Sequence, residues 1–270
     1  MSTSRELKEL VREKYGDVAR RSEQQNDGSC GCGGECCSSE SGTDMMAEEY
    51  SNLSGYVAAA DLGLGCGLPT EFAQIRPGDV VIDLGSGAGN DAFVARSLVG
   101  ETGRVIGIDL TEAMLERANR NVQTLGFTNV EFRLGDIEDM PIEDSVADVV
   151  VSNCVMNLVP DKQKAFAETF RILKQGGHFS ISDIVLTGIL PENIRSAAVM
   201  YAGCVSGAQQ KDEYLETIKK AGFVNVAIQK EKKIILPDNI VLQYLPQKEL
   251  DAFRKDGAGI YSITVYAEKP

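Results

Sequence analysis

The stretch DLGSGAGND, residues 83–91, decides the fold of this chain. Its first two residues end a short apolar run at 80–84, and its last residue begins a segment with helical periodicity at 91–98. Glycines between a strand and a helix let the backbone turn tightly and approach a ligand, and the start of the helix offers N–H groups without intrahelical partners. The stretch therefore predicts a strand, a ligand-binding turn and a helix.

Outward from this stretch, short strands alternate with helices. We expect further strands at 105–109, 130–134, 147–152 and 179–185, with helices at 111–125 and 161–174 between them. Such an alternation is typical of an α/β protein with a mostly parallel sheet and helices on both faces. A helix at 213–221 and late strands at 224–236 and 260–268 could complete the sheet with an antiparallel edge.

The chain divides into three regions. Residues 1–44 combine a helix at 4–20, with Leu7, Leu10, Val11 and Tyr15 on one face, and a Ser/Gly-rich arm at 22–44 whose composition cannot bury a core. Residues 45–186 form the α/β core. Residues 187–270 hold a helical insertion at 191–207 and the sheet-completing strands. We expect the arm to be mobile.

Composition narrows the class of protein. Of 270 residues, 43% are hydrophobic and 25% charged, as in a soluble globular protein. Lys plus Arg number 27 against 40 Asp plus Glu, a net charge of 27 − 40 = −13, which argues against a nucleic-acid partner. No apolar run has membrane-spanning length, and the first residues are too charged for a signal peptide. We therefore expect a cytoplasmic protein without a membrane partner.

Acidic residues stand at the ends of the first three strands. Asp83 precedes the first glycine, where a carboxylate would repel a pyrophosphate but could hold an ammonium group. Asp109 ends the second strand, at the distance in sequence from the glycine turn that is expected for a residue that bonds ribose hydroxyls. Asp136 follows the third strand and could accept a hydrogen bond from an adenine amine. An NAD-type fingerprint fits poorly, because Asn90 replaces its third glycine. A ligand with ribose, adenine and a cationic amino-acid tail is S-adenosylmethionine. The residues expected to contact or shape its pocket are Asp83, Gly85, Ser86, Gly87, Asn90, Asp91, Asp109, Leu110, Asp136, Ile137 and Asn153.

Four runs in register carry a family resemblance. DLGSGAGND, GIDL, GDIEDMP and LKQGGHF together resemble the motifs of class I S-adenosylmethionine-dependent methyltransferases. The resemblance implies a Rossmann-like, mostly parallel seven-stranded sheet with the cofactor across the carboxyl ends of the strands. The alternative is a Rossmann-like domain that binds another nucleotide or none.

The side chains available for catalysis point to an unusual acceptor. Methyl transfer to a weakly acidic oxygen or nitrogen usually needs a general base, and the single histidine, His178, sits where a structural role is favoured. Among the seven cysteines, Cys66, Cys154 and Cys204 lie on loops or element ends near the carboxyl edge of the sheet. Each of them, taken alone, is more often a buried inert thiol.

Three thiolates at one edge would form a soft, pyramidal site for a thiophilic ion. Zinc prefers four ligands, commonly including histidine. Trivalent arsenic needs three sulfurs and keeps a lone pair that can attack a sulfonium methyl group without losing a proton.

The surrounding sequence agrees with this interpretation. DLGLGCGLP, SNCVMNLVPDK and YAGCVSGA are similar to the signature loops of arsenite S-adenosylmethionine methyltransferases, and the similarity extends from residues 11–15 to Phe223. It implies stepwise methylation of thiol-bound arsenite to methyl- and dimethylarsenicals. As(III) would be bound by Cys66, Cys154 and Cys204, with Cys154 and Cys204 retained throughout and Cys66 needed for the first methylation.

Transfer of a methyl cation to arsenic raises its formal oxidation state by two, and a dithiol that closes to a disulfide returns two electrons. We hypothesise that Cys66 pairs with Cys36 or Cys37 of the arm and that thioredoxin or glutathione resets the enzyme. The arm could instead capture soft ions or be a solvated linker. Rival functions are methylation of an organic acceptor such as a quinone or lipid, and arsenical binding without catalysis.

Overall fold

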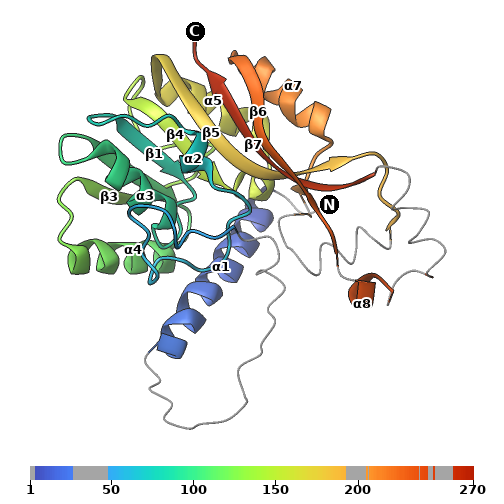
Figure 1. Cartoon of the computed structure of the whole chain (residues 1–270), viewed down its shortest axis with the longest axis horizontal. Helices are drawn as coiled ribbons and strands as arrows, with labels where there is room; N and C mark the ends of the chain where they lie inside the picture. Colours follow the sequence, from blue (N-terminus) through green and yellow to red (C-terminus); the bar gives the residue numbers. More distant parts are fainter. Residues whose placement is uncertain are drawn as a thin grey trace.

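The computed structural model describes residues 4–26, 48–192, 205, 207–236, 238–242, 246 and 258–270. Seven strands of this part of the chain form one sheet in the order β3-β2-β1-β4-β5-β7-β6 (Figure 1). The strands are β1 (Val80–Leu84), β2 (Arg104–Asp109), β3 (Val130–Leu134), β4 (Ala147–Asn153), β5 (Leu173–Thr187), β6 (Val224–Ile234) and β7 (Gly259–Glu268). The expected Rossmann-like, mostly parallel seven-stranded sheet is confirmed.

Strands β1 to β5 pair in parallel, and β7 pairs antiparallel with both β5 and β6. The two late strands therefore complete the sheet at one edge through antiparallel pairing, as expected, with β7 beside β5 and β6 outermost. Burial explains the order, because β7 is buried along most of its length whereas β6 is largely exposed. Lys230, Lys232 and Lys233 of β6 suit an edge strand, since lysine discourages pairing with a further strand.

Helices cover both faces of the sheet. They are α1 (Ser4–Asn26), α2 (Pro69–Phe72), α3 (Asn90–Val99), α4 (Glu112–Leu125), the 3-10 turn η1 (Met156–Leu158), α5 (Lys162–Ile172), α7 (Lys211–Lys220) and α8 (Asp238–Val241). Alternate side chains of β1 enter two separate cores: Ile82 packs in the cluster of α5 and α7, and Val81 in that of α3. This two-sided burial accounts for the continuous apolar run of β1.

Helix α1 differs from the expected one in length and in orientation. It extends to Asn26, into the segment expected to be an arm, and it lies against α4 (Figure 1). Leu7 and Leu10 are 39% and 61% exposed, whereas Ala19 is buried. The face of α1 that is turned toward the core contains Lys8 and Ala19. The Lys8 ammonium binds acidic side chains of the core. The expected face is therefore divided, because Leu7 and Leu10 are exposed whereas Val11 and Tyr15 are partly buried.

Helix α5 also ends earlier than expected. Leu173 is extended (φ −70°, ψ 139°) and already pairs with Ala147 of β4, so β5 begins directly where the helix stops. The expected insertion at 191–207 lies mostly outside the described residues. None of the helices in the described part of the chain combines the length and apolarity that a membrane crossing requires.

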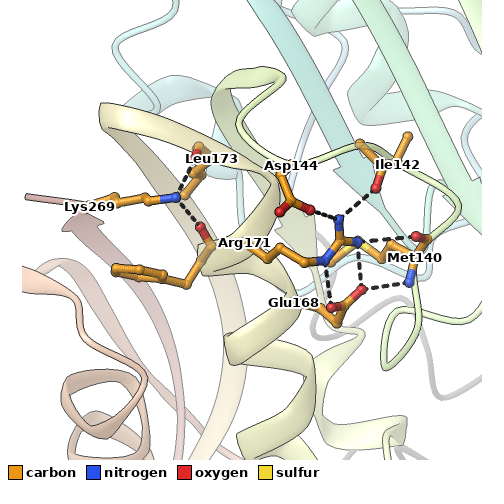
Figure 2. Close-up of polar contacts among 8 residues, drawn as sticks. Met140, Ile142, Asp144, Glu168, Arg171, Leu173 and Lys269 are labelled. Carbon is orange, nitrogen blue, oxygen red and sulfur yellow. Dashed lines mark hydrogen bonds and ion pairs between the residues drawn. The ribbon is translucent and has the colours of Figure 1, made fainter.

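Arg171 of α5 fixes the segment that follows β3 (Figure 2). Its guanidinium donates to the carbonyls of Met140 and Ile142 and pairs with Glu168 and Asp144. Glu168 in turn accepts from the Met140 N–H at 2.8 Å. Hydrogen bonds from Arg171 lower the pKa of Glu168, which keeps this carboxylate charged. The segment carrying Asp136 is thus anchored from its far end.

Candidate active site

A pocket opens at the carboxyl ends of β1 to β4, where open α/β sheets bind ligands. All eleven residues that the sequence assigned to a cofactor line it, from the glycine loop, the ends of the strands and the start of α3. They are Asp83, Gly85, Ser86, Gly87, Asn90, Asp91, Asp109, Leu110, Asp136, Ile137 and Asn153.

The glycine loop is held tightly at the floor of the pocket. Gly85 has φ +66°, and a Cβ there would collide with Val155, so this position favours glycine on both counts. Asp109 binds the loop to β2, because its carboxylate accepts from the N–H groups of Gly87 (2.9 Å) and Thr111 (2.8 Å). Thr111 is the N-cap residue of α4, and its side chain makes no capping hydrogen bond to the helix.

Three buried carboxylates give the pocket its electrostatic character. Burial raises the pKa of Asp83 well above its ordinary value, and the neighbouring charges of Asp91 and Asp109 raise it further. Burial also raises the pKa of Asp91 to about 6, against hydrogen bonds from Asn153 and Tyr50 that favour its charged form. A positively charged ligand would relieve the repulsion among these carboxylates and favour their ionised forms.

Polar atoms without partners agree with a ligand at this place. Asp83 Oδ2, Ser86 Oγ and Asn90 Oδ1 are buried without a hydrogen-bond partner among the described residues. Since buried polar groups are normally satisfied, their gathering at one pocket fits a bound group with several donors. The ammonium, the ribose hydroxyls and the sulfonium charge of S-adenosylmethionine match this set.

Helix α1 contributes a wall that sequence reasoning missed. Lys8, Val11 and Tyr15 line the pocket, and Lys8 Nζ lies 2.6 Å from Asp136 Oδ2 and 2.5 Å from Glu138 Oε2. Asp136, expected to accept from an adenine amine, thus already holds the Lys8 ammonium. The available signal was the i, i+3, i+7 spacing of these three α1 residues.

Two of the three expected arsenic ligands lie together beside the pocket. Cys66 and Cys154, 1% and 4% exposed, belong to one buried apolar cluster, and Cys154 also lines the pocket. Cys154 has φ +63°, a strained conformation for a residue with a Cβ. Val205 packs in the same cluster. Cys204, Cys36 and Cys37 lie outside the described residues, and the described part contains no group of three potential metal ligands.

Asn153 connects the Cys66 loop to the pocket. Its Oδ1 accepts from the N–H groups of Cys66 (2.9 Å) and Gly67 (3.3 Å). Its Nδ2 donates to the Gly67 carbonyl (2.8 Å), Tyr50 Oη (2.5 Å) and Asp91 Oδ2 (3.1 Å). Although Asn153 lines the pocket, its amide group is already engaged by the protein itself. Tyr50 lines the pocket too and was not foreseen.

A buried carboxyl lies on β5 close to the thiol cluster. Asp183 has no exposed surface, and its Oδ2 accepts from Tyr214 Oη at 3.3 Å. Burial raises the pKa of Asp183 to about 7. His178 lies five residues before Asp183 on β5, where its Nε2 is 2.7 Å from the Ala73 carbonyl, a position consistent with a structural role.

Comparison with known proteins places this chain in a family. A methyltransferase-domain model matches residues 75–222. The arsenite methyltransferase of Halobacterium salinarum is 40% identical, over 98% of this chain and 67% of that protein. The chain belongs to the arsenite methyltransferase family.

Other members of the arsenite methyltransferase family are more distant and longer. The human arsenite methyltransferase is 35% identical over 81% of this chain and 58% of its own length. The crystal structure of the Chlamydomonas reinhardtii arsenic(III) S-adenosylmethionine methyltransferase is 36% identical, with a TM-score of 0.61 over 75% of this chain and 66% of that one. The chain therefore spans about three-fifths to two-thirds of these relatives. The chain is an S-adenosylmethionine-dependent methyltransferase.

Proposed function

We propose that this enzyme transfers methyl groups from S-adenosylmethionine to trivalent arsenic held by the thiolates of Cys66, Cys154 and Cys204. The observation that carries the proposal is the shared burial of Cys66 and Cys154 in one cluster, with Cys154 at the wall of the cofactor pocket. Val205, the neighbour of Cys204 in the chain, packs in the same cluster, which supports a place for the third thiol nearby.

The chemistry suits a site without a general base. When bound, S-adenosylmethionine supplies an electrophilic methyl group on a sulfonium ion. Asp83 and Asp91 would hold its cationic amino-acid end, and the cysteine thiolates would orient the arsenic lone pair toward the methyl carbon. One As–C bond forms, one S–C bond breaks, and no proton leaves the acceptor. The site therefore needs positioning and exclusion of water more than proton transfer.

The electron balance requires a dithiol. Methyl cation transfer converts arsenic formally from trivalent to pentavalent, and two thiols that form a disulfide return two electrons and release two protons. We propose Cys66 as one partner and Cys36 or Cys37 as the other, with glutathione or thioredoxin reducing the disulfide after each cycle. If variants that lack all four cysteines at 30–37 keep multiple turnovers, this pairing is wrong.

Product identification tests the proposed activity. Purified protein is incubated with S-adenosylmethionine, glutathione and either arsenite or methylarsenite, and the arsenicals formed are separated and identified. We expect the wild type to methylate both substrates. Cys154→Ser should methylate neither, whereas Cys66→Ser should fail on arsenite and retain activity on methylarsenite.

Parallel incubations with a quinone and a phenol as acceptors separate the proposal from an organic methyltransferase with inert cysteines. Activity on arsenite that survives in Cys154→Ser would overturn the ligand assignment. Binding of arsenite without consumption of the methyl donor would indicate a binding protein instead of an enzyme.

A further inference from the structure

The Cys66 loop is held mainly by the Asn153 side chain, with further hydrogen bonds from Ser262 Oγ to the Cys66 carbonyl (2.5 Å) and from Tyr50 Oη to the Gly67 carbonyl (3.0 Å). Residues 64–67 form neither helix nor strand, and Asn153 holds the backbone of Cys66 and Gly67 through three hydrogen bonds of 2.8–3.3 Å. A Cβ at Gly65 would lie 2.7 Å from Asn153 Nδ2, so the loop can approach this amide only with glycine there. The position of the Cys66 backbone therefore depends in part on the orientation of the Asn153 amide, and the Tyr50 hydroxyl contacts the same loop.

The same amide is bound to the wall of the cofactor pocket. Its Nδ2 reaches Tyr50 Oη at 2.5 Å and Asp91 Oδ2 at 3.1 Å. Tyr50 Oη in turn contacts both Asp91 carboxylate oxygens, at 2.9 and 3.0 Å. Tyr50 is 4% exposed and its ring packs against Leu68 and Val94, so the hydroxyl cannot turn to solvent instead.

Asp91 connects this network to the cofactor. It lies in the first turn of α3, directly after the glycine loop, and lines the pocket. Its negative charge has two protein donors, Tyr50 and Asn153, and the buried Asp83 carboxylate close by adds repulsion. A cation that enters the pocket relieves this repulsion and competes with the two donors for the same carboxylate.

We propose that Tyr50, Asn153 and Asp91 are positioning residues that couple occupancy of the cofactor pocket to the placement of Cys66. The proposal deepens the function proposed above and rests on it for its role in catalysis. Coupling between two sites is reciprocal, so a bound cofactor changes the setting of the Cys66 loop to the extent that the loop changes cofactor affinity.

Cys154 is the natural internal reference. Although Asn153 precedes it, the Cys154 N–H donates to the Ser182 carbonyl at 2.8 Å, so its backbone is fixed by β5 and not by the amide network. Because Cys154 lines the pocket, a bound ligand can shield its thiol directly, whereas coupling through Tyr50 acts on Cys66. Tyr50→Phe should therefore reduce the ligand effect at Cys66 and leave the ligand effect at Cys154 unchanged. A general loosening of the fold would affect both thiols alike.

Thiol alkylation measures the coupling without arsenic. Intact protein is treated with iodoacetamide with and without saturating S-adenosylhomocysteine, and modification of Cys66 and Cys154 is followed by peptide mass spectrometry. In the wild type, the ligand should change the Cys66 rate by about fivefold or more, within the range of ordinary allosteric coupling. The Tyr50→Phe variant keeps the buried ring and removes the hydroxyl. In this variant, the ratio of the Cys66 alkylation rates with and without ligand should fall toward one.

A matched control variant is Tyr266→Phe, which also loses a hydroxyl–carboxylate hydrogen bond (2.9 Å, to Glu268), at the far end of β5 and β7. It should show the wild-type ratio. If Tyr50→Phe does not fold, Asp91→Asn replaces it with the same expected loss of coupling. A Cys66 rate that is insensitive to the ligand in the wild type, or equally sensitive in the variant, would overturn the proposal.

These outcomes are independent of the proposed substrate. Coupling of Cys66 without any arsenite methylation would leave the positioning network standing and reject the substrate. Arsenite methylation without coupling of Cys66 would support the proposed substrate and reject the positioning network.

Discussion

Cofactor affinity should depend on pH through the buried carboxylates of the pocket. Burial raises the pKa of Asp91 to about 6, so the empty pocket takes up a proton on Asp91 as the pH falls through that value. A bound sulfonium and ammonium favour the ionised carboxylate and expel the proton. Binding of S-adenosylmethionine should therefore be strongest above pH 7 and weaken on acidification.

The magnitude follows from that pKa. With one proton to displace, apparent affinity scales as 1/(1 + 10^(6 − pH)), which gives a loss of about tenfold, or roughly 1.4 kcal/mol, between pH 7 and pH 5. The pKa of Asp83 is also raised, by burial and by Asp91 and Asp109, so a second displaced proton would steepen the dependence.

Isothermal titration in buffers of different ionisation enthalpy measures affinity and proton release together. We expect proton release on binding near pH 6 and a weaker dependence in Asp91→Asn. Asp212→Asn, which removes an exposed carboxylate of α7, should behave as the wild type. An affinity that is constant, or that increases toward pH 5, would refute the electrostatic argument.

Three further predictions concern stability and the pocket wall. Burial raises the pKa of Asp183 from the ordinary 3.8 to about 7, so its ionisation destabilises the folded state as the pH rises from 4 to 7. Over that interval, urea unfolding should show Asp183→Asn gaining ~3 kcal/mol relative to the wild type, and equal pH profiles of the two proteins would contradict this. Cys154 has φ +63°, which costs a residue with a Cβ roughly 1–2 kcal/mol, and glycine avoids this cost. The denaturant midpoint of Cys154→Gly should therefore equal or exceed that of Cys154→Ala. Lys8→Met removes the ion pairs with Asp136 and Glu138 and should speed hydrogen exchange in α1 and weaken cofactor binding about two- to fivefold; unchanged exchange would show that these pairs do not hold the helix.

The sheet and the pocket were predictable because their signals are local. Strands β1 and β3 have the bounds that their apolar runs indicate, and acids at strand ends gather at one edge in any parallel sheet. The residues at 83–91 therefore specified both the fold and the pocket.

The features that were not predicted depend on contacts distant in sequence. Two overlapping faces of helix α1 could pack on the core, one containing Leu7 and Leu10 and one containing Lys8. The acidic partners of Lys8, 128 and 130 residues away in the chain, select the second face as the inward one. The end of α5 is set by the pairing of Leu173 with Ala147. The Asn153 amide is engaged by a loop that lies 86 and 87 residues earlier in the chain. Such choices are made by tertiary packing, which local propensity does not contain.

The proposed activity depends on sulfur atoms of this chain that hold arsenic beside the cofactor pocket. X-ray absorption at the arsenic edge, on protein loaded with one equivalent of arsenite and freed of excess thiol, counts the neighbouring sulfurs directly. We predict three sulfur neighbours in the wild type and a loss of one in each of Cys66→Ser, Cys154→Ser and Cys204→Ser. Oxygen-only coordination, or a sulfur count that none of these substitutions lowers, would contradict it.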